Sequence, residues 1–216
     1  MKPALRAAAA VAALAALGAC SLVPRAPKPQ TTEGEWASKR DAATRRAFLY
    51  NAFDHQATAT ATFLSLEVRE ARARRLGEWL GWTPAELQAR LDQERREAAE
   101  GEELFLSFYT SEPKNNDLDA PRSIWRVAVR VDDVDVVARR VTGADRNDNA
   151  IGLFPYIGPF DVAYRVLLPA APGGPLTGRP FVVEIASAVG RLTLDYGAPP
   201  GPLLLVPQGP GPVPKP

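Results

Sequence analysis

The strict alternation of apolar and polar side chains over residues 125–131 constrains the fold more than any other feature of this sequence. Trp125, Val127, Val129 and Val131 alternate with arginine or alanine, which gives an extended strand one apolar face. The same period recurs in the segments 48–50, 57–63, 104–109, 162–168, 181–185 and 192–194. Because these segments do not alternate with helices, they favour an antiparallel β-sandwich or a barrel-like domain over a parallel sheet.

Residues 65–100 break this pattern and predict a helical hairpin inserted into the β-rich domain. Ser65 is a suitable N-cap for a first helix that ends at Gly81. The segment Thr83-Pro84-Ala85-Glu86 offers an N-cap, a proline at the first helical position and the glutamate of a capping box. A second helix should therefore run from there to about Ala99. The predicted fold class is α+β, mainly β.

The first of these helices is rich in arginine, which allows two interpretations. A basic helix suits anionic lipid head groups, whereas arginines interspersed with glutamates are typical of a solvated helix face. The acidic residues of the same helix favour the solvated face. The residues concerned are Arg69, Arg72, Arg74 and Arg75, with Glu67, Glu70 and Glu78 among them.

The first 20 residues carry the pattern of a bacterial export signal. Lys2 and Arg6 precede an apolar run over residues 7–17, which is too short to span a bilayer as a helix. The run ends in Leu17-Gly18-Ala19-Cys20, which resembles the lipobox of bacterial lipoproteins. This resemblance implies that the thiol of Cys20 receives a diacylglycerol and that residues 1–19 are removed. The alternative is an ordinary secretory signal, whose cleavage site would use Gly18 and Ala19.

Lipid on Cys20 would anchor the mature chain to a membrane without spanning it. Ser21 follows the cysteine, where lipoproteins kept in the inner membrane usually carry aspartate. Resemblance to that sorting rule implies the outer membrane, with the domain in the periplasm.

The two ends of the mature chain read differently from its middle. Residues 20–34 predict an extended, proline-rich tether, and residues 35–197 predict a single β-rich domain. Residues 198–216 contain 8 prolines and 3 glycines and predict a disordered tail. An alternative for part of the tail is a proline-rich ligand at Pro207-Gln208-Gly209-Pro210.

Charge and residue counts exclude several classes of function. The sequence has 26 basic and 25 acidic residues, and loss of Lys2 and Arg6 with the signal leaves 24 against 25. A net charge of −1 argues against a nucleic-acid partner. The single cysteine and single histidine, Cys20 and His55, cannot build a zinc site, and no phosphate-binding loop or Gly-x-Ser-x-Gly motif occurs. We predict no cofactor, and a turn or strand-end role for His55.

One polar loop resembles the opening of a calcium-binding loop. Asp145, Asn147 and Asn149 stand at alternate positions, as calcium ligands do. However, Ala150 occupies the position of the usual glycine, and Tyr156 occupies that of the twelfth, acidic ligand. These residues are therefore weak candidates for a metal site.

A second polar loop, residues 112–119, is a candidate partner surface. Asn115, Asn116, Asp117 and Asp119 either stabilise turns through their own backbone or present polar groups to an envelope protein. With the flanking segments 108–109 and 123–126, this region resembles uncharacterised lipoproteins of high-GC, Gram-negative bacteria. The resemblance covers the middle and later parts of the chain and implies no particular activity.

Residues 152–160 concentrate aromatic side chains between two prolines. Exposed, they would form an apolar recognition patch; buried, they would pack beneath the edge of the sandwich. We favour burial.

These observations favour a non-catalytic module that binds another envelope component. The alternative is an envelope hydrolase that uses a pair of carboxylates as acid and base. Convergence of Asp117, Asp119, Asp145 and Asp148 around one cleft would favour the hydrolase.

Overall fold

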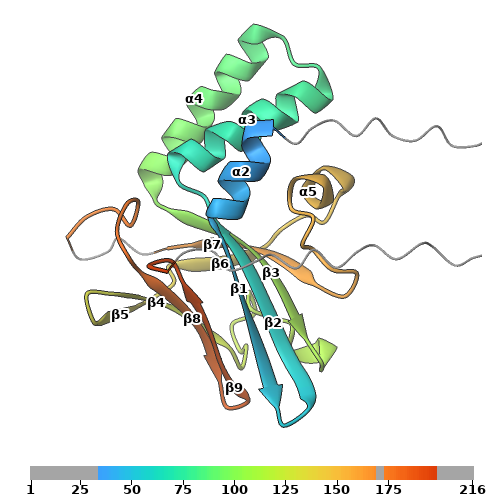
Figure 1. The fold of residues 1–216 in the computed structure, drawn as a ribbon, viewed down its shortest axis with the longest axis vertical. Coiled ribbons are helices and arrows are strands. Elements are labelled where there is room, and N and C mark those ends of the chain that lie inside the picture. Colours follow the sequence, from blue (N-terminus) through green and yellow to red (C-terminus); the bar gives the residue numbers. More distant parts are fainter. Residues whose placement is uncertain (1–33, 169–172, 199–216) are drawn as a thin grey trace, which may run out of the picture. The chain divides into compact units, whose positions relative to one another are not determined.

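Two antiparallel sheets form a sandwich in the computed structural model, which describes residues 34–168 and 173–198 (Figure 1). The five-stranded sheet has the order β1 (Thr44–Asn51), β2 (Asp54–Phe63), β3 (Glu103–Thr110), β7 (Val162–Leu167) and β6 (Arg140–Gly143). The four-stranded sheet has the order β5 (Val134–Val137), β4 (Arg126–Val131), β8 (Val182–Ser187) and β9 (Gly190–Asp195). This arrangement confirms the predicted α+β fold and its sandwich form, and it is not a closed barrel.

The main core lies between the two sheets and follows the predicted alternation. Val127, Val129 and Val131 of β4 are buried, as is Trp125 just before the strand. The ring of Trp125 meets Phe108 of β3 edge-on, with centroids 5.3 Å apart. The polar residues of β4 face outward, so the strand with the clearest period lies as the sequence predicted.

The first and last described strands close one side of the sandwich. β1 contacts β9, and the Arg45 guanidinium donates from Nε to the carbonyl of Asp195 at 2.8 Å. The Tyr196 hydroxyl donates to the carbonyl of Ala61 on β2, also at 2.8 Å. These bonds join residues that are 135 to 150 positions apart in the sequence.

A helical layer covers part of the outer face of the five-stranded sheet. It consists of α2 (Gly34–Ala42), α3 (Leu66–Leu80), α4 (Pro84–Glu100) and α5 (Asp148–Leu153), and a short 3-10 turn, η1 (Pro113–Asn115), lies after β3. A second core forms here, in which the ring of Phe105 on β3 stacks on the ring of Phe154, with centroids 3.9 Å apart. Trp36 of α2 joins this core and donates its indole N–H to the carbonyl of Leu153 at 3.1 Å.

The helical hairpin begins and ends as its capping signals predicted. The Ser65 hydroxyl accepts from the backbone of α3, and Gly81 ends that helix with a φ of 65°. Thr83 and Glu86 form the reciprocal capping box of α4. None of the helices among residues 34–168 and 173–198 combines the length and the apolar character needed to cross a bilayer.

The aromatic segment 152–160 packs largely as we favoured. Phe154, Tyr156 and Ile157 are buried beneath the five-stranded sheet. The Tyr156 hydroxyl shares a hydrogen bond with Thr62 at 2.7 Å, and burial raises the pKa of this phenol. Phe160 differs, because its ring is 79 % exposed.

Candidate functional site

The predicted partner loop uses its two asparagines to hold itself against the domain. The carbonyl of Asn115 accepts from the indole N–H of Trp125 at 2.9 Å, and the Asn116 amide donates to the carbonyl of Phe108 at 2.8 Å. The Tyr164 hydroxyl donates to the Asn116 carbonyl at 2.8 Å. Burial raises the pKa of Tyr164 to about 12, so this donor keeps its proton.

The two aspartates of the same loop also have internal partners. Asp117 accepts from the Ser123 hydroxyl at 2.9 Å, and Asp119 accepts from the backbone N–H of Gly143 at 3.2 Å. The side-chain oxygens that made this loop a candidate recognition surface therefore stabilise it, and a role in partner binding stays a prediction.

The predicted calcium loop starts a helix. The Asn147 side chain caps α5 by accepting from the backbone N–H of Ala150 at 2.9 Å. Within the described parts of the chain, no three His, Cys, Asp or Glu side chains gather closely enough to hold a metal ion. Asp117, Asp119, Asp145 and Asp148 thus form no such group. His55 lies near the start of β2, where its Nε2 is 2.6 Å from the Thr58 hydroxyl, which matches the predicted strand-end role.

Charged residues are buried where the helical hairpin meets the sheet. Arg69 of α3 is 1 % exposed, so the solvated face expected for this helix is wrong at that position. Its guanidinium donates to Glu103 of β3 at 2.7 Å, to Glu94 of α4 at 3.3 Å and to Glu97 at 3.4 Å. Its Nε donates to the carbonyl of Leu64 at 3.1 Å. One arginine therefore joins both helices to the sheet.

Both buried carboxylates of this network are held in the ionised form. Burial acts to raise the pKa of Glu94, but ion pairs with Arg72 and Arg90 outweigh it and lower the pKa. Burial likewise acts to raise the pKa of Glu103, but the hydrogen bond from Arg165 and the charge of Arg69 lower it. A general acid needs the opposite shift, so these carboxylates do not resemble the acid of a hydrolase.

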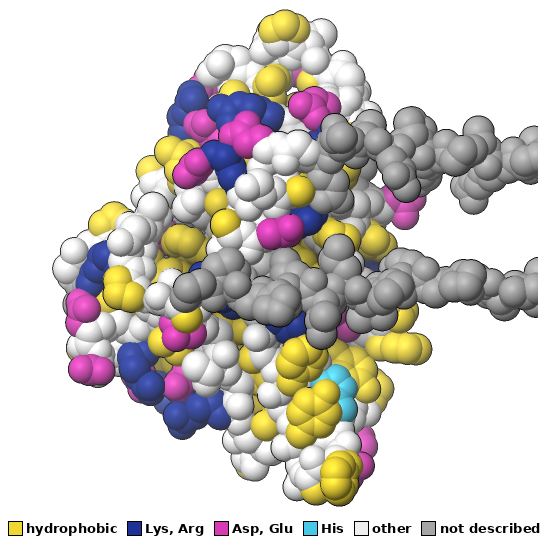
Figure 2. Space-filling model, viewed as in Figure 1, with side chains coloured by type: hydrophobic (Ala, Val, Ile, Leu, Met, Phe, Trp, Pro, Cys, Tyr) yellow, Lys and Arg dark blue, Asp and Glu magenta, His cyan; other side chains and the backbone are white. Residues whose placement is uncertain are grey.

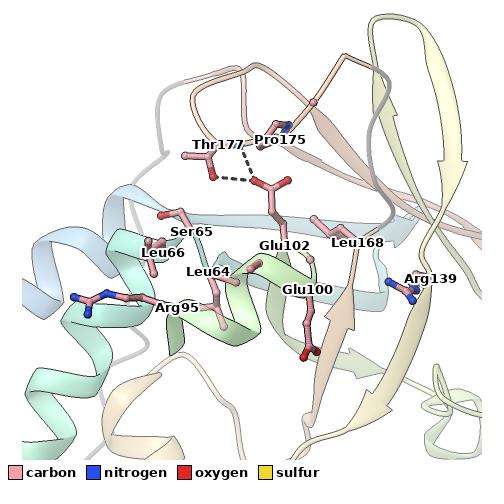
Figure 3. Close-up of a pocket in the computed structure, with 14 residues that line it drawn as sticks. Leu64, Ser65, Leu66, Arg95, Glu100, Glu102, Arg139, Leu168, Pro175 and Thr177 are labelled. Carbon is pink, nitrogen blue, oxygen red and sulfur yellow. Dashed lines mark hydrogen bonds between the residues drawn. The ribbon is translucent and has the colours of Figure 1, made fainter. Parts of the chain in front are cut away.

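A cleft with a largely apolar lining lies elsewhere, beside the start of α3, and has a volume of about 560 Å³ (Figure 3). Five segments that are distant in the sequence form it: the start of α3, the end of α4 with the residues that follow it, Arg139, Leu168 after β7, and residues 174–177. Its apolar lining consists of Leu64, Leu66, Ala98, Ala99, Leu168 and Pro175. Its volume and lining fall in the range that proteins use to bind apolar groups.

One glutamate holds the rim of this cleft in place. The Glu102 carboxylate accepts from the backbone N–H groups of Leu176 at 2.6 Å and Thr177 at 2.8 Å. It also accepts from the Thr177 hydroxyl at 2.8 Å, and Figure 3 shows the two side chains pointing toward each other. The rim segment is therefore fixed to the base of β3.

Charges of both signs surround the apolar lining. Figure 3 shows Arg95 and Arg139 on opposite sides of the cleft. Arg95 pairs with Glu70 and Asp92. The side chains of Arg139 and Glu100 have no hydrogen-bonding or ionic partner among the described residues, so they are available to a bound molecule.

Sequence reasoning missed this cleft because no single stretch contains it. Leu64 and Leu66 look like helix-start residues, and Ala98 and Ala99 look like an ordinary helix end. Only the structure shows that Leu66, in the first turn of α3, is 42 % exposed. Comparison of the chain with protein-family models, with curated proteins and with solved structures found no match.

Proposed function

We propose that this chain is an outer-membrane lipoprotein whose periplasmic domain is a non-catalytic binding module. Lipid on Cys20 would hold the domain at the membrane, and the cleft beside α3 would bind an apolar segment of another envelope protein. The lipobox-like Leu17-Gly18-Ala19-Cys20 supports the anchor. These four residues lie outside the described part of the chain.

The cleft is the observation that carries the binding role. Leu64 and Leu168 form its floor at 1 % and 2 % exposure, whereas Leu66 stays open to an incoming side chain. An apolar side chain that enters would remove the exposed surface of Leu66 from water, which is favourable in proportion to the buried area.

The charges at the rim favour a peptide as the occupant. Neither Arg139 nor Glu100 has a side-chain partner within residues 34–168 and 173–198, so the rim can pair with both a carboxylate and an ammonium or guanidinium group. A peptide segment with an apolar side chain and flanking charges satisfies the lining and the rim together, whereas a hydrocarbon chain satisfies the lining alone.

Photo-crosslinking in intact cells of the native host tests the binding role. A photoreactive residue replaces Ala99, which lines the cleft, or Ala89, which is exposed on the same helix outside it. We expect one defined protein adduct from position 99 and none from position 89, with mass spectrometry identifying the partner peptide. The same adducts from both positions, or none from position 99, would reject the cleft as the binding site.

A pair of leucine substitutions sharpens this test. Leu66→Glu places a charge in the cleft, and Leu80→Glu places one at the far end of the same helix. The two leucines are 42 % and 50 % exposed, so the folding cost should be similar. The adduct at position 99 should disappear with Leu66→Glu and persist with Leu80→Glu.

Mass spectrometry of chain purified from its native host tests the anchor separately. We expect the mature protein to begin at Cys20 and to carry the mass of two or three acyl chains. An unmodified Cys20 thiol would remove the anchor from the proposal while leaving the cleft untouched.

A further inference from the structure

The β1–β2 turn carries the most exposed large apolar side chain in the described residues. Phe53 is 99 % exposed at the tip of this two-residue turn. The residue before it, Ala52, has a φ of 53°, a left-handed conformation that is unfavourable for a residue other than glycine. Turns of this length usually use Asn-Gly. The chain thus accepts strain at a position where the phenylalanine ring gains no contact within the domain.

A group of aromatic side chains lies on the strands next to this turn. It consists of Phe48 and Tyr50 of β1, His55 of β2 and Tyr109 of β3, and we call these residues the aromatic patch. Adjacent rings contact each other, with centroids 5.1 Å apart for Tyr50 and His55 and 5.2 Å apart for His55 and Tyr109. Figure 2 shows apolar side chains gathered around the cyan histidine. Phe48 and Tyr50 are 49 % and 57 % exposed, so the patch is open to solvent.

A second apolar turn lies at the same end of the molecule. The turn between β8 and β9 carries Val189, which is 43 % exposed. Figure 1 shows this turn and the β1–β2 turn at one end of the sandwich. Gly190 approaches β1 so closely that a Cβ there would lie 2.7 Å from the Leu49 side chain. Residues 51–54 and 187–190, which make the two turns, contain one charged residue, Asp54.

We propose that this end of the sandwich inserts shallowly into the interface of a phospholipid bilayer. Phe53 enters deepest, Val189 enters beside it, and the aromatic patch lies at the level of the head groups. A projecting tip suits a fluid interface that yields around it, and Tyr and His rings combine an apolar body with a polar edge, as residues at membrane interfaces do. The turns carry no Lys or Arg, so the contact depends on apolar burial and suits neutral phospholipids.

The length of chain before the domain permits this contact. From Cys20 to Gly34 there are 14 residue steps, which extend to at most about 46–50 Å. From Gly34 to Phe53, the path through α2 and β1 has 8 helical and 11 extended steps, which span at most about 48 Å. The two lengths match, so an extended tether lets a lipid on Cys20 and the Phe53 tip reach one bilayer surface together. The inference rests on the proposed anchor in one respect, because the anchor keeps the tip at high local concentration near the membrane.

A fluorescent label at the tip tests the inference in the full mature chain. Phe53→Cys, labelled with a polarity-sensitive thiol-reactive fluorophore, is returned to phosphatidylcholine vesicles. Leu80→Cys serves as the control, because Leu80 is also exposed but lies at the end of α3. We expect a blue-shifted emission and quenching by acyl-chain-brominated lipid at position 53, and neither at position 80. Equal emission and quenching at the two positions would overturn the proposal.

Three further measurements distinguish the ways in which the proposal could fail. A lipidated Cys20 has no free thiol, so each variant should bind one fluorophore per chain. Two fluorophores per chain would contradict the anchor. The substitution Cys20→Ser would then leave the fluorophore at position 53 as the single source of the signal. Tyr50→Asp, combined with Phe53→Cys, should reduce the blue shift, because the substitution charges the aromatic patch. High salt should leave the signal unchanged. Loss of the signal at high salt would overturn apolar insertion in favour of charge pairing.

Discussion

The two interiors of this domain differ in one respect, because only the one beneath the helices combines its apolar core with a buried network of charges. Between the sheets, the core is apolar throughout and includes fully buried residues such as Phe108 and Ile185. Between the helical hairpin and the sheet, Arg69, Glu94 and Glu103 are equally buried but carry full charges. The core between the sheets tolerates apolar substitutions that keep its volume filled. Beneath the hairpin, each charged side chain requires its specific partner, because a buried charge without its partner is strongly unfavourable.

Removal of the central arginine should have the largest effect and should separate the two interiors most clearly. Arg69→Ala removes the cation that Glu94 and Glu103 share, empties the space of a 1 % exposed side chain and leaves the Leu64 carbonyl without its donor. Arg72, Arg90 and Arg165 still pair with the two carboxylates, and the free energy of unfolding should fall by about 3–5 kcal/mol in urea titrations. Arg74→Ala, which removes a 43 % exposed partner of Glu70 on the same helix, should cost no more than about 0.5 kcal/mol. Similar losses in the two variants would show that the buried network is no more than a surface ion pair.

Truncation of a side chain in the apolar core should lower the free energy of unfolding almost as much as Arg69→Ala does. Leu106 of β3 is 1 % exposed, and Leu106→Ala should lower the free energy of unfolding by about 3 kcal/mol through lost burial and the cavity left behind. This loss should be the same at pH 7 and pH 4, because no titrating group takes part. A pH-dependent loss would contradict the separation of the two interiors.

Acid should weaken the charged interior and spare the apolar one. The folded pKa values of Glu94 and Glu103 lie below the ordinary value of 4.5. Their contribution to stability is therefore complete above that value and is lost as the pH falls through the folded pKa values. Chemical denaturation between pH 7 and pH 3 should show this loss. Glu103→Gln should be less stable at pH 7 and should show a shallower decline; an unchanged slope would contradict the assignment.

The smallest effect should come from the exposed link between the two helices. Thr83→Ala removes the capping-box hydroxyl of α4 and should lower the free energy of unfolding by about 1 kcal/mol. Gln88→Ala, on the exposed surface of the same helix, should change it by less than about 0.5 kcal/mol. Equal effects in thermal unfolding would mean that the cap contributes nothing.

Local patterns in the sequence predicted the apolar interior and the helical hairpin. The alternation in residues 125–131 predicts which face of the strand is buried. Ser65, Gly81 and Thr83 predict helix ends, because capping depends on hydrogen bonds and backbone conformation within a few residues. The elements that sequence reasoning missed have weak local signals. α2 and α5 are short, and β5 and β6 have four residues each, too few for a period to show.

The charged interior and the cleft were not predictable because both depend on contacts between distant segments. Arg69 and Glu103 are 34 positions apart, and nothing in either neighbourhood distinguishes them from surface residues. Leu66, Ala99 and Pro175 meet only after the hairpin has folded onto the sheet. The polar loops show that residues typical of binding sites also stabilise the fold, since Asn116 donates to the carbonyl of Phe108 and Asn147 accepts from the N–H of Ala150.

The contact between β1 and β9 has a consequence for how the chain is made. Arg45 near the start of the domain finds its partner, Asp195, only when almost the whole domain has been synthesised. β3 likewise waits for β7, and β4 waits for β8. A growing chain that has passed only its first hundred residues therefore holds sheet faces with no matching layer. The complete sandwich can therefore form only after residue 195 has been synthesised.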